Sequence, residues 1–103
     1  MEITLIDAEQ QAFDFLMEDL KIFPDHQEWF TLLSSRLIKE SWYVVEIGVA
    51  ELPDKWIIQV YDSGCDPSYT FSSSMPATED TDLAIPQQIT DLLTIERRAG
   101  GWR

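Results

Sequence analysis

The chain has 103 residues, of which 45% are hydrophobic, and its nineteen Asp and Glu outnumber seven Lys and Arg to give a formal net charge of −12. This length and composition predict a single domain over residues 1–103, with too little glycine and proline for a disordered chain. The charge repels nucleic acid and anionic membranes, and it favours a basic protein or a cation as partner. One cysteine excludes an intramolecular disulfide, and no stretch has the pattern of a signal peptide or a membrane span, so we expect a cytoplasmic protein.

The first predicted element is a helix that ends near Lys21. Asp7 followed by Gln10 is typical of a capping box, and apolar residues then recur at helical spacing. Residues 3–6 are β-like, and they either form a brief edge strand or lead into this helix.

A second helix is predicted from Asp25 to about residues 39–40. Phe23-Pro24 ends the first helix, because proline disfavours helical geometry in the residue before it. Asp25 and Glu28 then form another capping-box pattern. The apolar residues that follow at helical spacing are Trp29, Phe30, Leu32, Leu33, Leu37 and Ile38.

Residues 41–61 predict a β-hairpin, because two runs rich in β-branched and aromatic residues flank a turn signal at residues 51–54. With Leu52-Pro53 at the apex, Val49 pairs with Trp56. One face of the pair is then wholly apolar and forms the core, with Val45, Ile47, Val49, Trp56, Ile58 and Val60. The other face is mixed, and either a helix covers it or a partner binds it; it carries Trp42, Val44, Glu46, Ile57, Gln59 and Tyr61.

A third strand and a last helix complete the predicted fold. Residues 69–73 alternate aromatic and small polar residues, which indicates an antiparallel edge strand next to the second strand of the hairpin. Residues 74–82 indicate an exposed acidic loop, and Pro86 suits the start of a helix that ends before Gly100. The expected class is α+β, with two N-terminal helices, a three-stranded antiparallel meander and a C-terminal helix. The helices form a single layer on one face of the sheet.

Residue patterns that carry enzyme chemistry are sparse. His26 is the only histidine, and the carboxylates beside Cys65 disfavour its thiolate. Phosphate-binding glycine motifs are missing. We therefore expect neither an enzyme nor a cofactor or metal site. The alternative is a divalent-cation-binding module or a small enzyme that uses the acidic loops 62–66 and 79–82, whose oxygens suit weak cation binding without the spacing of an EF-hand.

Two hypotheses connect the chain to nucleic acid. The order of helix, strands and helix resembles the double-stranded-RNA-binding fold, but residues 85–88 replace the lysines with which such domains hold phosphates, so no RNA binding is expected. A DNA mimic would display acids in rows, and Asp7, Asp14 and Glu18 supply only a fragment of one.

The sequence therefore favours a small acidic binding protein that acts by stoichiometric protein–protein interaction with a basic partner, as acidic immunity proteins and inhibitors do. Complementary charge would speed the encounter, and aromatic anchors would supply most of the affinity. The expected partner-binding residues are Trp42, Val44, Glu46, Ile57, Tyr61, Glu79, Asp80 and Asp82.

Overall fold

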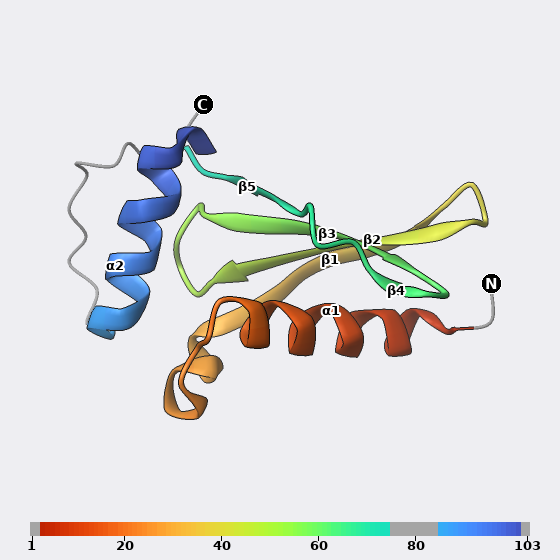
Figure 1. The fold of residues 1–103 in the computed structure, drawn as a ribbon, viewed down its shortest axis with the longest axis horizontal. Coiled ribbons are helices and arrows are strands. Elements are labelled where there is room, and N and C mark those ends of the chain that lie inside the picture. The colour runs from red at the N-terminus through yellow and green to blue at the C-terminus, as the bar shows by residue number, and fades with distance from the viewer. Residues whose placement is uncertain (1–2, 75–84, 102–103) are drawn as a thin grey trace.

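The computed structural model describes residues 3–74 and 85–101, which form an α+β fold with an antiparallel sheet. The helical elements are α1 (Leu5–Asp19), a 3₁₀ helix η1 (Pro24–Trp29), α2 (Gln87–Glu96) and a π-helical turn η2 (Arg97–Gly101). The strands are β1 (Phe30–Ile38), β2 (Trp42–Val49), β3 (Lys55–Tyr61), β4 (Gly64–Cys65) and β5 (Thr70–Ser72). Helix α1 runs along one side of the sheet, and α2 stands across the end of the sheet near the β2–β3 connection (Figure 1).

Helix α1 begins earlier than the sequence pattern predicts. Thr4 is the N-cap, and its hydroxyl accepts a hydrogen bond from the backbone N–H of Asp7 at 3.1 Å. The carboxylate of Asp7 accepts the reciprocal bond from the backbone N–H of Thr4, so Asp7 completes a capping box as its third helical residue instead of opening one. Leu5 and Ile6 therefore lie in the first helical turn and not in a strand. The residues of α1 that are buried are Ala8, Ala12, Leu16 and Met17.

The predicted second helix is wrong. Its first residues form the short helix η1, and the rest form β1, a strand antiparallel to β2. Thr31, Ser34 and Ser35 favour this outcome, because threonine and serine are poor residues for a helix interior. The connection between β1 and β2 consists of Lys39, Glu40 and Ser41, and its first two residues adopt left-handed backbone angles, with φ of 50° and 56°. Such turns normally contain Asn or Gly, so the hairpin has no recognisable signature in the sequence.

The predicted pairing of β2 with β3 has the right faces and the wrong register. Trp56 lies opposite Ile47, and Ile58 lies opposite Val45, which is a shift of two residues from the expected pairs. The shift arises because the connection is longer than a tight turn at Leu52-Pro53, and Val49 pairs with β1 instead.

The predicted core face of this hairpin is confirmed. Its six predicted side chains are all buried, and they form one cluster with residues of both helices. The six are Val45, Ile47, Val49, Trp56, Ile58 and Val60. The predicted strand at residues 69–73 is confirmed as β5, which pairs with one half of β3, while the short strand β4 pairs with the other half. The sheet of the described residues has five strands instead of the predicted three, because β1 and β4 were not expected as strands.

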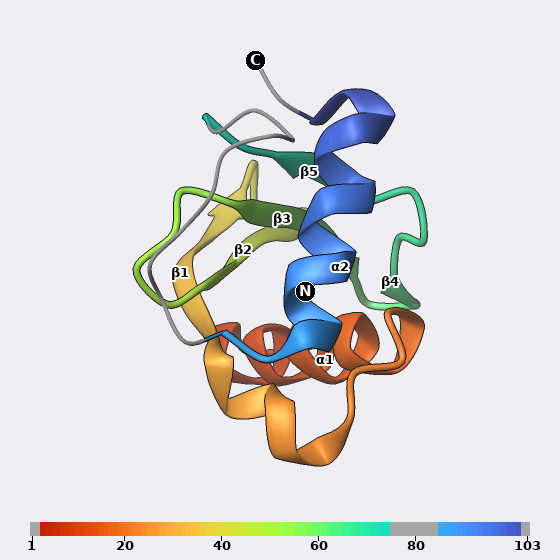
Figure 2. The same cartoon turned by 90° about the vertical axis from the view of Figure 1, so that its left-hand side faces the viewer.

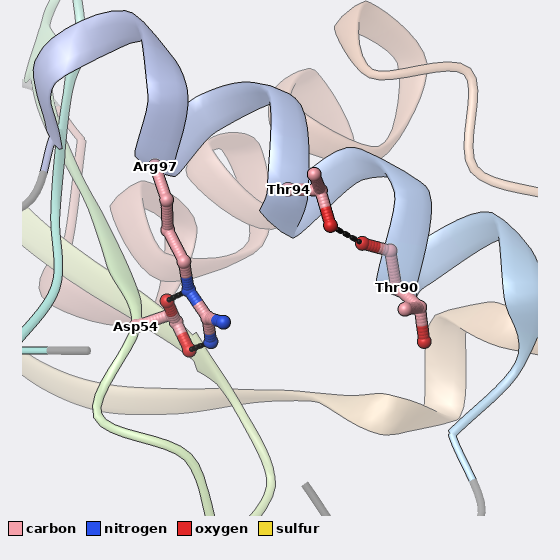
Figure 3. Close-up of polar contacts among 4 residues, drawn as sticks. All are labelled: Asp54, Thr90, Thr94 and Arg97. Carbon is pink, nitrogen blue, oxygen red and sulfur yellow. Dashed lines mark hydrogen bonds and ion pairs between the residues drawn. The ribbon is translucent and has the colours of Figure 1, made fainter. Parts of the chain in front are cut away.

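The C-terminal helix begins next to Pro86, as predicted, and its end is held by a buried ion pair. Nε and Nη2 of Arg97 donate hydrogen bonds to Oδ1 and Oδ2 of Asp54 at 2.7 and 2.6 Å (Figure 3). The indole Nε1 of Trp56 donates to Oε2 of Glu96 at 2.9 Å. Arg97 is the C-cap residue of α2. In the structure this residue links α2 to the β2–β3 connection.

Candidate binding surface on the outer face of the sheet

The sheet has two faces of different character. The inner face contacts α1 and the core, and Figures 1 and 2 place the described helices on that side or across the end of the sheet. We call the opposite side the outer face. Side chains on it are half-buried or exposed, in alternation with the buried inner residues of β2 and β3. The outer face comprises Thr31, Leu33, Ser34, Arg36, Ile38, Trp42, Val44, Glu46, Lys55, Ile57, Gln59 and Tyr61.

An aromatic pair occupies one end of the outer face. The ring centroids of Trp42 and Tyr61 lie 6.1 Å apart at an interplanar angle of 32°. The hydroxyl of Tyr61 donates a hydrogen bond to Oε1 of Gln59 at 2.6 Å. Both rings are half-buried. Large, well-oriented aromatic side chains of this kind are typical anchors of protein–protein interfaces.

The centre of the outer face combines apolar side chains with one ion pair. Val44 lies opposite Gln59, and Glu46 lies opposite Ile57 on the neighbouring strand. Nζ of Lys55 is 2.8 Å from Oε1 of Glu46. Because this ion pair is partly solvated, it contributes at most about 1 kcal/mol to stability. Its members remain available to a docking partner.

Leu33 belongs to the outer face because β1 contains a bulge. The pairing of β1 with β2 shifts between Leu32 and Ser34. The extra residue lies over Gly48, where an added Cβ would be 2.7 Å from Cδ1 of Leu33 and 2.9 Å from the carbonyl oxygen of Asp54. Sequence reasoning missed Leu33 because it assigned this residue to a helix. A glycine within a strand does signal close approach by another group, and that was the available clue.

The structure brings five of the eight predicted partner-binding residues together. Trp42, Val44, Glu46, Ile57 and Tyr61 all lie on the outer face. No helix of residues 3–74 and 85–101 covers this face, so the alternative of a second core layer is not realised in that part of the chain. The remaining predicted residues, Glu79, Asp80 and Asp82, lie outside the described residues.

In the part of the chain that the structure describes, the surroundings of His26 and Cys65 give these two residues structural roles and no catalytic arrangement. Nδ1 of His26 donates to Oε1 of Gln88 at 2.7 Å, and Nε2 of Gln88 donates to the carbonyl oxygen of Lys21 at 2.8 Å. These bonds tie the α1–η1 connection to α2. Burial raises the pKa of the half-buried Cys65 thiol, which disfavours the reactive thiolate.

The acidic loop at residues 62–66 forms part of a turn. Oδ1 of Asp66 accepts a hydrogen bond from the backbone N–H of Ser68 at 2.8 Å. Within the described residues, no group of three or more His, Cys, Asp and Glu is placed to hold a metal ion. Residues 79–82, the other loop considered for cations, lie outside that part of the chain.

A concave region lies beside the C-terminal half of α1. It has a volume of about 300 Å³ and is lined by Phe15, Glu18, Asp19 and Lys21. The hydroxyl of Tyr69 donates to Oδ2 of Asp19 at 2.5 Å. Burial, this hydrogen bond and the negative charge of Asp19 raise the pKa of Tyr69. The arrangement fastens the loop before β5 to α1.

The chain therefore belongs to the α+β class of folds. Within the described residues, no helix covers one face of its antiparallel sheet. Comparison with family models, with curated proteins and with solved structures finds no match to the chain. In the part of the chain that the structure describes, none of the helices has the length and apolar character needed to cross a membrane.

Proposed function

We propose that this chain is a small acidic binding protein that acts by stoichiometric association with a basic protein, in the manner of an immunity protein or an inhibitor. The outer face of the sheet is the docking surface. The observation that carries the proposal is the aromatic pair Trp42 and Tyr61, which shares this open face with apolar side chains in a chain of net charge −12.

The two parts of this observation have separate roles. The net negative charge attracts a basic partner over a distance of about a Debye length, near 8 Å at physiological salt, and thereby raises the association rate. The apolar and aromatic side chains supply the affinity at short range, because burying them removes apolar surface from water. The Lys55–Glu46 pair at the centre gives the partner a donor and an acceptor to match, which favours one docking orientation.

The test is affinity capture from a lysate of the native organism with three baits. The baits are the wild-type chain, Trp42→Ser, and Phe23→Ser as a matched control. Phe23 is 59% exposed and lies before η1, away from the outer face, so its replacement removes an exposed aromatic ring without touching the proposed surface.

We expect wild type and Phe23→Ser to retain the same basic protein in a one-to-one complex that high salt dissociates. Trp42→Ser should bind it at least about 30-fold more weakly, which corresponds to about 2 kcal/mol for an interface anchor. Failure to recover any basic protein in a salt-sensitive complex would contradict the proposal. Equal binding by Trp42→Ser would place the interface elsewhere.

Calorimetry addresses the alternative of a cation-binding module or a small enzyme. Titration of the chain with Ca²⁺ and Mg²⁺ should give no tight, stoichiometric heat of binding. A tight one-to-one signal with either ion would favour that alternative over the binding-protein proposal.

A further inference from the structure

Strand β1 (Phe30–Ile38) forms a long edge of the sheet. Among the described strands it pairs with β2 alone, whereas the opposite edge consists of the short strands β4 and β5. Its sequence, FTLLSSRLI, contains no proline and no acidic residue. An edge strand presents a row of backbone donors and acceptors that can pair with another strand, and natural edges are usually short or interrupted by proline and charge.

Apolar side chains stand beside this edge. On the inner side, a shallow groove of about 250 Å³ is lined by Ile6, Glu9, Gln10, Phe13 and Leu32. Leu37 lies on the same side of the strand, opposite Tyr43 of β2, and is 43% exposed. The edge therefore carries an apolar projection, Leu37, and a groove next to Leu32 whose apolar lining is Ile6, Phe13 and Leu32.

The bulge makes the projection and the groove equidistant from Ser35. Leu33 and Ser34 together count as one pairing position, so Leu32 and Leu37 each lie two positions from Ser35. A two-fold axis at Ser35 in an antiparallel β1–β1 pair places Leu37 of each copy opposite Leu32 of the other. This reciprocal arrangement is what a two-fold interface requires, because residue i must contact residue j in both directions.

The charges at this edge act in both directions on a second copy. Most of the chain repels another molecule with the same net charge of −12. The single charged residue of β1 is Arg36, and Lys39 follows it in the turn. In the pairing about Ser35, Arg36 lies opposite the Leu33–Ser34 bulge of the other copy and not opposite Arg36. The hydroxyl of Ser35 donates a hydrogen bond to Oε2 of Glu9, so the pairing also brings the Glu9 carboxylates of the two copies near the axis. Their repulsion opposes the dimer and is screened by salt.

We propose that β1 is a homodimerisation edge, which pairs antiparallel with β1 of a second copy about a two-fold axis at Ser35. Leu37 of each chain fills the groove beside Leu32 of the other, and the two sheets become continuous. The outer faces remain open, so this proposal does not depend on the proposed basic partner.

The dimer has a defined response to salt. Its interface is small, below about 1,200 Å² in total, a size typical of weak complexes. Because both copies are acidic, salt screens their mutual repulsion and strengthens the dimer. A complex with a basic partner responds in the opposite way.

The first experiment is analytical ultracentrifugation of the purified chain over a concentration series. It uses low- and high-salt buffers in which the Debye length is about 30 Å and about 3 Å. The variants are Leu37→Glu and, as a matched control, Ile95→Glu, whose parent side chain is 64% exposed on α2. We expect a wild-type dimer that tightens with salt, at least tenfold weaker association for Leu37→Glu, and no change for Ile95→Glu.

The second experiment tests the register by oxidative cross-linking in a Cys65→Ser background. Ser35→Cys places the two thiols across the axis, with Cα atoms about 4.5–5.5 Å apart, within the range of a disulfide. Thr31→Cys on the same strand separates them by about 20 Å, six positions at about 3.3 Å each. Melting temperatures of all variants report whether each one is folded.

A covalent dimer from Ser35→Cys but not from Thr31→Cys supports the proposed axis. The proposal is overturned by a chain that stays monomeric at high salt and high concentration. It is equally overturned by a dimer that Leu37→Glu leaves intact, or by equal cross-linking at both positions.

Discussion

The buried ion pair between Asp54 and Arg97 allows a quantitative test of what holds α2 to the sheet. The side chain of Asp54 is 0% exposed, and that of Arg97 is 5% exposed. Replacing Arg97 with Met keeps an apolar chain in place and removes both donors to the carboxylate. Asp54 is then left as a buried charge without this partner.

We expect Arg97→Met to lower the free energy of unfolding by about 3–5 kcal/mol, the usual cost of removing one member of a buried pair. The total stability of a chain of this length is about 5–15 kcal/mol, so the variant loses a large share of it. Each kcal/mol corresponds to roughly 4–8 °C in a small domain, and the melting temperature should therefore fall by more than about 10 °C.

The assay is urea unfolding followed by tryptophan fluorescence, with the double variant Asp54→Leu/Arg97→Met as the control. Replacing both members of a buried pair with apolar residues is often close to neutral. The double variant should therefore be more stable than Arg97→Met alone, at an unchanged dependence on urea. A loss below about 1 kcal/mol for Arg97→Met, or a double variant less stable than it, would refute the reasoning.

Three further predictions concern the sheet and its attached loop. Ile58→Ala should lower the free energy of unfolding in urea by about 2–5 kcal/mol, and Glu46→Ala should lower it by less than about 1 kcal/mol, because only the side chain of Ile58 is fully buried. Equal losses for the two variants would mean that both faces of the sheet are covered. Gly48→Ala should cost about 1–3 kcal/mol, since the added Cβ meets the carbonyl oxygen of Asp54 at 2.9 Å, and a neutral result would contradict this contact. Because the pKa of Tyr69 is raised in the folded chain, its protonated hydroxyl contributes fully to stability below about pH 10, and this contribution is lost as the pH rises further. In thermal melts above about pH 10, the melting temperature of Tyr69→Phe should therefore fall less than that of the wild type.

The sequence predicted the two faces of the β2–β3 hairpin although it predicted the wrong register. A shift of two residues returns every side chain to the same face, whereas a shift of one would exchange the faces. Val45 and Ile58 are therefore core residues in either register, and Trp42 and Tyr61 remain together on the outer face. This periodicity explains why the described candidate surface could be predicted without the correct pairing.

Strand β1 could not be predicted in the same way. Its leucines recur at spacings that suit a helix, and the bulge at Leu33 removes the strict alternation of a strand. The turn at Lys39–Glu40 lacks the glycine or asparagine that marks such hairpins. The ion pair between Asp54 and Arg97 could not be predicted either, because the two residues lie far apart in the sequence and only the tertiary fold brings them together.

The two proposed interactions are coupled through charge. Pairing two chains by β1 doubles a net charge of −12 within one particle, and the resulting repulsion opposes the dimer. A basic protein bound to the outer face neutralises part of that charge and lowers the cost of dimerisation. Because coupling between two binding equilibria is reciprocal, the dimer must then bind the basic partner more tightly than the monomer does. Leu37→Glu, which removes the dimer and spares the outer face, should therefore weaken partner binding at low salt and have little effect on it at high salt.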